Sequence, residues 1–137
     1  MIGKRIVIIL AFFVGLSGCI FATETFSYAV RDIGTSKSFD FDKMSPIDKT
    51  DQFPQDTKEI VAYFLPDTDA DNIPIFCQWG YEGDVIAKQE VQLLQGVYNV
   101  CWIVSETGFS PGSYRITVLF GPTDVRFAEF FVLDTAE

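Results

Sequence analysis

The sequence predicts an all-β protein folded as an antiparallel β-sandwich of about seven strands. Three observations support this prediction. After the first nineteen residues, no stretch of ten or more carries an apolar stripe with helical periodicity. Short runs rich in β-branched and aromatic residues recur about every 12 residues, with turn-forming residues between them. The aromatic content is 15%, which suits a packed core rather than a disordered chain.

The first expected strands lie in the middle of the chain. Phe39–Asp42 alternates apolar and acidic residues, which predicts a short edge strand. Glu59–Leu65 is a stronger β-rich run, and the acidic loop 67–72 follows it. Ile73–Trp79 is the next strand. Its alternate residues are apolar and should face the core: Ile75, Cys77 and Trp79.

Two further strands follow a turn at residues 80–84. The run 85–93 is weaker and places one set of residues on a single face: Val85, Ala87, Gln89, Val91 and Leu93. Val97–Val104 is almost entirely apolar, which is typical of a strand covered on both sides. Core packing is therefore also the expectation for Trp102.

The last two strands form a hairpin. A turn at 108–112 precedes the alternating strand Tyr114–Phe120, and Gly121-Pro122 turns the chain into Val125–Leu133. If Ala128, Phe130 and Val132 face the core, the residues between them face outwards: Phe127, Glu129 and Phe131. Two outward Phe side chains predict a contact surface, or a second layer formed over them by residues 20–45.

The N-terminus has the layout of an export signal. A charged start at Met1–Arg5 is followed by the uninterrupted apolar run Ile6–Leu16. Leu16-Ser17-Gly18-Cys19 then resembles the lipobox of prokaryotic lipoproteins. The resemblance implies that residues 1–18 are a signal peptide, that Cys19 receives a diacylglyceryl group, and that cleavage occurs immediately before Cys19. Two acyl chains would anchor the protein durably to a membrane.

Two other interpretations of this segment stay open. Ile6–Ala22 is at the short limit for an uncleaved membrane span, and an ordinary signal could be cut near Ala22. Each alternative also places the domain outside the cytoplasm. We expect the outer membrane for a diderm source and otherwise the outer face of the cell membrane. The expected organisation is signal peptide 1–18, tether or first strand 19–35, and sandwich domain 36–137.

Charge limits the partners. The chain has a net charge of −9, and without Lys4 and Arg5 it keeps 8 basic and 19 acidic side chains, a net charge of −11. Such a surface repels phosphate backbones, so nucleic acid is not an expected partner. Anionic lipid headgroups would be repelled too, so membrane attachment has to come from a covalent or inserted anchor and not from a basic patch. There is no His, which removes His-dependent triads and His-ligated zinc.

Several motifs resemble those of prokaryotic Ig-like domains. Trp79-Gly-Tyr-Glu-Gly83 is similar to the turn after a central strand of these domains. Ser110–Val118 and Ala128–Val132 are similar to their closing hairpin. The resemblance implies an Ig-like sandwich that serves as a cell-surface scaffold or binding module, without identifying its ligand. The cysteine spacing of antibody domains is absent.

Cys77 and Cys101 are the remaining cysteines. Export permits a disulfide between them, and the alternative is two buried thiols acting as small apolar residues. Asp67, Asp69 and Asp71 match the start of a calcium loop. However, Asn72 and Gln78 replace the Gly and the bidentate Glu of that loop, so we expect a solvated turn and no metal site.

The expected function is a structural or protein-binding role at the cell envelope. The candidate binding surface consists of four aromatic residues: Tyr81, Phe109, Phe127 and Phe131. Two of these, Tyr81 and Phe109, lie in turns and are expected to be exposed. A carbohydrate or small-ligand module is the alternative, followed by an enzyme or enzyme inhibitor. We predict no catalytic residues and no cofactor, because no paired carboxylates, phosphate-binding loop or nucleophile elbow is present.

Overall fold

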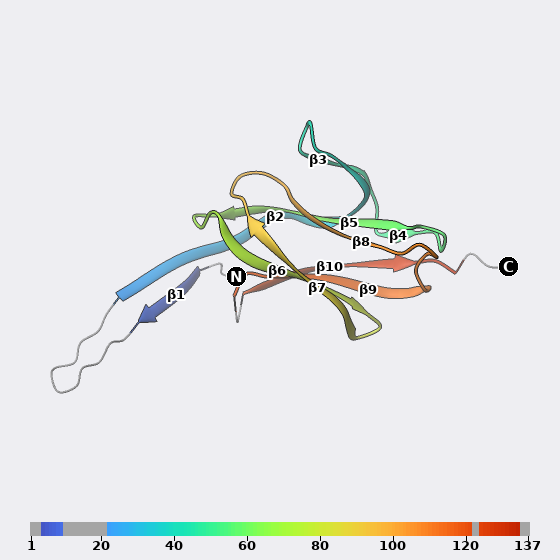
Figure 1. The fold of residues 1–137 in the computed structure, drawn as a ribbon. Coiled ribbons are helices and arrows are strands. Elements are labelled where there is room, and N and C mark those ends of the chain that lie inside the picture. Colours follow the sequence, from blue (N-terminus) through green and yellow to red (C-terminus); the bar gives the residue numbers. More distant parts are fainter. Residues whose placement is uncertain (1–3, 10–21, 122–123, 135–137) are drawn as a thin grey trace.

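The computed structural model describes residues 4–9, 22–121 and 124–134, and it confirms an all-β sandwich. The described residues form ten strands, three more than expected. One sheet contains β1 (Lys4–Ile9), β2 (Ala22–Asp40), β5 (Glu59–Thr68) and β8 (Asn99–Val104) in that order, with β3 (Ser45–Lys49) paired to β2. The other sheet has the order β4 (Gln52–Phe53), β10 (Val125–Val132), β9 (Gly112–Leu119), β6 (Ile73–Tyr81) and β7 (Asp84–Leu93). Figure 1 shows the two layers.

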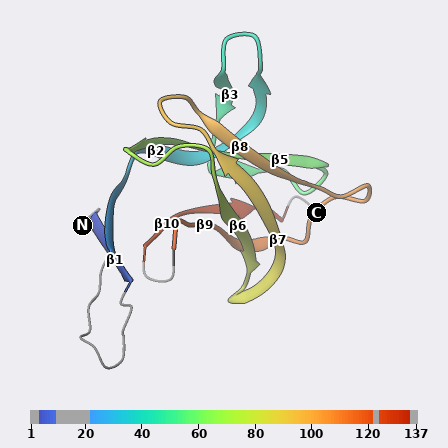
Figure 2. The same ribbon diagram turned by 60° about the vertical axis from the view of Figure 1, so that its left-hand side comes forward.

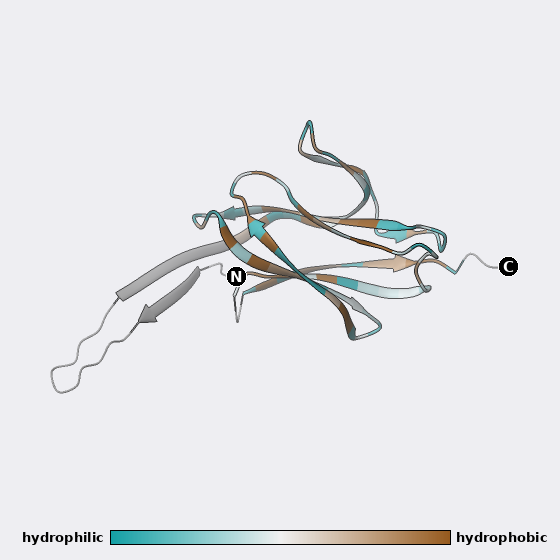
Figure 3. Cartoon of the chain, viewed as in Figure 1, coloured by the Kyte–Doolittle hydropathy of each residue, from teal (hydrophilic) through white to brown (hydrophobic). Residues whose placement is uncertain are grey.

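The core lies between the two sheets and depends on alternation along most strands, visible as hydrophobic and hydrophilic bands in Figure 3, whereas β5 is buried at consecutive residues. Trp79 is fully buried, as predicted. Phe130 lies at the centre of the core. Its ring makes an edge contact with Phe53 at 5.6 Å and with Trp79 at 6.1 Å, and it stacks on Tyr114 at 5.1 Å.

Two local differences from the sequence prediction have clear causes. Phe39 belongs to the end of the long strand β2, and Phe41 lies in the turn to β3, so the predicted edge strand 39–42 is part of a hairpin. Val85 is exposed because the β6–β7 register shifts between Trp79 and Gly80. The type I′-like turn there has positive φ at Glu82 and Gly83.

Two hairpins project from the sandwich (Figures 1 and 2). In the first, β1 pairs with residues 22–27 of β2, whereas the pairing of β2 with β5 begins only at Tyr28. The second consists of β3 and the end of β2, and we call residues 36–49 the arm. No helix of the described residues is both long and apolar enough to cross a membrane.

Candidate functional site

Phe127 and Phe131 are exposed on the outer face of β10, as the alternation predicted. Their exposed fractions are 49% and 42%, so residues 20–45 form no covering layer over them within the described structure. The guanidinium of Arg115 lies 4.1 Å from the ring centroid of Phe127 and 2.7 Å from Glu129 Oε2. Phe127 therefore already has a cation over its ring.

Tyr81 and Phe109 are not exposed in the way the sequence suggested. Both are half-buried and pack against the core. The ring of Tyr81 is 4.6 Å from that of Tyr114, and Phe109 makes an edge contact with Tyr114 at 6.4 Å. Tyr81 Oη also donates to the carbonyl of Pro111 at 2.9 Å. Tyr81 is the last residue of β6 and lies opposite Tyr114 in the β6–β9 register, so together with Phe109 it covers Tyr114 at one end of the core.

Cys19 lies outside the described residues, so its lipidation stays a prediction. Cys77 and Cys101 are buried and have free thiols in the structure. Their side chains belong to the core cluster, and this position is compatible with both buried thiols and a disulfide.

The acidic loop is held by internal hydrogen bonds. Asp71 Oδ1 accepts from the backbone N–H of Gln95 at 2.8 Å, and Asn72, which has a φ of 59°, accepts from Gln92 at 3.0 Å. Within the described part of the chain, no group of three or more Cys, Asp or Glu could hold a metal ion. The loop therefore serves as a turn that is tied to the chain around residue 95.

A second exposed aromatic group includes a residue that the sequence placed in the core. Trp102 is 44% exposed, because only one face of β8 is covered. Cys101 and Ile103 point inwards, while Trp102 and Val104 point to solvent. The sequence did not predict this arrangement, because both faces of the run 97–104 carry apolar residues.

Trp102 forms an aromatic row with two residues of the arm. The ring centroids of Phe39 and Phe41 are 4.9 Å apart, and those of Phe41 and Trp102 are 6.5 Å apart, both in edge-to-face geometry. Phe39 is buried and Phe41 is 60% exposed. Between them lies a hollow of about 160 Å³, which we call the apolar hollow. It is lined by Ser38, Phe39, Phe41, Glu59, Val61 and Trp102.

The arm is fixed at its base. Lys49 Nζ is 2.9 Å from Asp32 Oδ2, and Tyr98 Oη donates to the same oxygen at 2.7 Å. Burial alone would raise the pKa of Asp32, but the hydrogen bonds from Lys49 and Tyr98 outweigh it and lower the pKa. Lys49 Nζ also lies 5.2 Å from the ring centroid of Tyr63. These contacts join β2, β3 and the residue before β8, so they fasten the base of the arm to the sheet.

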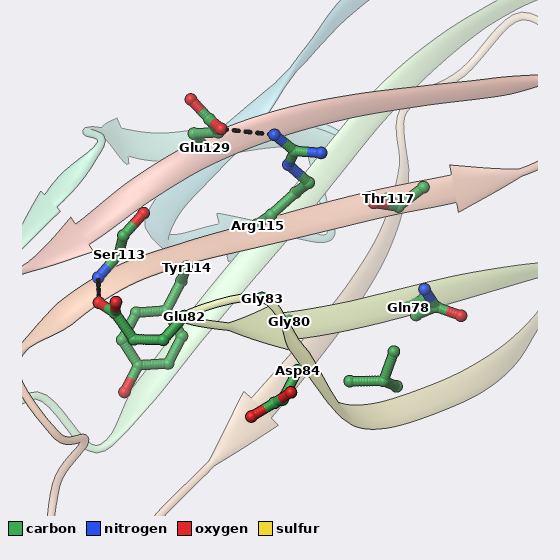
Figure 4. A pocket seen from close by; sticks show the side chains of 11 residues that line it. Gln78, Gly80, Glu82, Gly83, Asp84, Ser113, Tyr114, Arg115, Thr117 and Glu129 are labelled. Atoms are coloured by element: carbon green, nitrogen blue, oxygen red, sulfur yellow. Dashed lines mark hydrogen bonds and ion pairs between the residues drawn. The ribbon is translucent and has the colours of Figure 1, made fainter.

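A second hollow, of about 340 Å³, lies on the outer face of the other sheet beside the β6–β7 hairpin (Figure 4). Its lining is mainly polar, and several of its groups bond to one another. Glu82 accepts from the N–H of Ser113 at 2.7 Å, and Arg115 pairs with Glu129. Tyr114 lines the floor but is buried, with its hydroxyl donating to the carbonyl of Ser110 at 2.7 Å. No exposed ring is therefore available here for a sugar to stack on.

Comparison with protein-family models gives no match for this chain, and no curated protein sequence matches it.

Proposed function

We propose that this protein is an extracytoplasmic, lipid-anchored Ig-like module that binds a protein partner at the cell envelope. The observation that carries the binding role is the apolar hollow with its exposed rings, Phe41 and Trp102. A hollow of about 160 Å³ suits one apolar side chain of a partner. Exposed Trp and Phe residues around such a hollow are typical of the energetic centre of protein interfaces.

Two observations favour this hollow over the outer face of the second sheet. Among the described residues, no cation lies over the ring of Phe41 or Trp102, whereas Arg115 covers Phe127 and Lys88 lies 4.8 Å from the ring centroid of Phe76. The arm is also fastened at its base by the Asp32–Lys49 pair, so little conformational freedom would be lost when a partner binds.

Charge indicates the chemistry of the partner. Glu59 lines the apolar hollow, whereas the tip of the arm carries Lys43 beside Asp40 and Asp42, so the acidic character comes from Glu59 and from the chain as a whole. The mature chain would carry a net charge of −11. A segment with an apolar side chain next to Lys or Arg fits this surface, whereas a second copy of the acidic chain would be repelled.

Three features support the Ig-like identification. The short strand β4 runs parallel to β10 at the edge of its sheet. Trp79 fills the core. Tyr114, near the start of β9, bonds back to the carbonyl of Ser110, as the tyrosine at a strand corner does in Ig-like sandwiches.

The lipid anchor has separate support. The motif Leu16-Ser17-Gly18-Cys19 is its sequence basis. In addition, β1 pairs with residues 22–27 and not with the sandwich, so removal of residues 1–18 leaves the pairing of β2 with β5 intact. Cys19→Ser should abolish labelling with a radioactive fatty acid and leave the precursor uncut. Persistent labelling of this variant would refute the anchor.

Photo-crosslinking tests the binding role. A photo-reactive phenylalanine at position 41 of the exported full-length chain should give a discrete protein adduct. The same amino acid in place of Lys88, on the outer face of the other sheet, is the matched control and should not. The position-41 adduct should be lost with Trp102→Ala. Equal adducts from both positions, a dimer of the chain itself, or no adduct at all would contradict the proposal.

The polar hollow of Figure 4 keeps a small-ligand module as the second candidate. Gln78 and Thr117 line it and lie opposite each other in the β6–β9 register. Calorimetry with a panel of soluble oligosaccharides would test this role. Binding that Thr117→Val abolishes and Trp102→Ala leaves unchanged would favour it over the protein-binding role.

A further inference from the structure

Cys77 and Cys101 come from opposite layers of the sandwich. Cys77 lies on β6 in one sheet and Cys101 on β8 in the other. Both point into the core, with exposed fractions of 0% and 4%. A covalent bond between them would therefore join the two sheets through the interior.

The two sheets meet at this level, where the edge strand β7 lies in contact with β8. The Cys77 thiol is close enough to the Cys101 thiol to raise its pKa. A side-chain contact also links the edges of the two sheets here. Gln89 lies opposite Cys77 in the β6–β7 register, and its Nε2 donates to the carbonyl of Trp102, the residue after Cys101, at 2.8 Å. One side chain thus spans the gap between the edges of the two sheets.

We propose that Cys77 and Cys101 form an intersheet disulfide when the protein meets a disulfide oxidant, such as an oxidised dithiol protein. The new Sγ–Sγ bond takes the place of two S–H bonds, and the pair gives up two electrons and two protons. The oxidant's disulfide accepts them, breaks and becomes two thiols. This inference is independent of the proposed binding role, because it needs only the core geometry and an oxidant.

The route of exchange begins at Cys101. A hollow of about 300 Å³ opens at the edge between β7 and β8, and Cys101 lines it together with Gln89, Val91 and Trp102. The hydrogen bond with Cys77 and burial both raise the pKa of the Cys101 thiol, so thiolate is scarce at neutral pH. Oxidation should therefore be slow at pH 7 and faster at pH 9.

The bond would close a loop that runs from residue 77 to residue 101. Closing such a loop restricts the unfolded chain and stabilises the fold. For a domain of this size, we expect the thermal midpoint to rise by about 10 °C. The bond would also hold β8 in place directly beside Trp102, one wall of the apolar hollow.

The test uses the full-length chain carrying Cys19→Ser, so that only the two core cysteines remain. One sample is incubated with oxidised glutathione at pH 9 and another with a reductant, and both are then denatured and alkylated. In the oxidised sample, mass spectrometry should show a chain that carries no alkyl groups and is about 2 Da lighter than the reduced, unalkylated chain. A linked peptide that contains Cys77 and Cys101 should also be found. The thermal midpoint of the oxidised sample should exceed that of the reduced sample.

The single variants Cys77→Ala and Cys101→Ala serve as controls and should show no redox-dependent shift of the midpoint. Two alkylated cysteines after prolonged oxidation would overturn the proposal. So would glutathione retained on Cys101 without a bond to Cys77, because a neighbouring thiol in contact should displace it. A linked peptide without a rise in the midpoint would overturn the predicted stabilising effect.

Discussion

Trp79 offers the sharpest test of the sandwich core. Its side chain is fully buried and contacts Phe130, and its Nε1 donates to Gln89 Oε1 at 3.1 Å. A buried Trp removes about 200 Å² from water, which at about 25 cal/mol per Å² corresponds to roughly 5 kcal/mol. Partial collapse of the cavity reduces this loss. We therefore expect Trp79→Ala to lower the free energy of unfolding by about 3–5 kcal/mol.

This loss is a large share of the total stability of a small domain, which is about 5–15 kcal/mol. Trp79→Phe separates the contribution of the apolar contacts from that of the indole hydrogen bond. It keeps most of the apolar contact with Phe130 but leaves Gln89 Oε1 without the indole donor. We expect a smaller loss for Trp79→Phe, about 1–3 kcal/mol.

Urea denaturation followed by circular dichroism, with Cys19→Ser as the common background, measures both variants. Arg115→Ala is the control. Arg115 pairs with Glu129 and covers Phe127, so it is more than the ordinary surface residue that alternation alone suggests. Both members of the pair are about half exposed, so its loss should cost no more than about 1 kcal/mol. An unchanged midpoint for Trp79→Ala would refute the assignment of inward and outward faces.

Two further predictions concern a turn and the base of the arm. Gly108 has a φ of +93°, and a Cβ there would lie 2.5 Å from the Gln55 carbonyl oxygen. Gly108→Ala should therefore lower the free energy of unfolding, measured by urea denaturation, by more than about 2 kcal/mol. A smaller loss would contradict this packing. The lowered pKa of Asp32, held by Lys49 and Tyr98, adds stability that is complete above its usual pKa of 3.8 and is lost as the pH falls below it. Asp32→Asn should therefore lose less stability than the wild type between about pH 6 and pH 3, and equal losses would exclude this linkage.

The parts of the fold that the sequence predicted are those where polar and apolar residues alternate. Ile75, Cys77 and Trp79 alternate with more polar or exposed neighbours, so their inward direction could be deduced before the structure was known. Phe127 and Phe131 were assigned outwards for the same reason, and both are exposed. Period-two patterns determine the face of a strand because neighbouring side chains point to opposite sides.

Trp102 could not be assigned in this way. Its neighbours Cys101 and Ile103 are apolar, and so are Val100 and Val104, so the run has no polar face to mark solvent. The arm was equally difficult to predict. It depends on Lys49 reaching Asp32, seventeen residues away, and Tyr98, which is farther still. Local patterns contain no information about such distant pairs.

Tyr81 and Phe109 show a different limit. The sequence placed both in turns, and turn residues are usually at the surface. In the structure Tyr81 is the last residue of β6 and Phe109 lies in the loop before β9, and both rings pack against Tyr114 at one end of the core. The exposed fraction of a side chain at the end of a strand or in a loop therefore depends on whether other side chains already cover the adjacent end of the core.

If the chain is anchored at Cys19 as proposed, the way β2 enters the sandwich determines which end of the protein faces the membrane. Tyr28 and Ala29 pair with Thr68 and Asp67, so the chain enters the domain beside the acidic loop 67–72. Eight residues lie between Cys19 and Tyr28, and the extended chain between these two residues spans at most about 30 Å. Repulsion between the acidic end and anionic headgroups acts only within about one Debye length, about 8 Å at physiological salt. It would therefore keep the acidic end from lying on the bilayer, and the opposite end of the domain would be turned outwards.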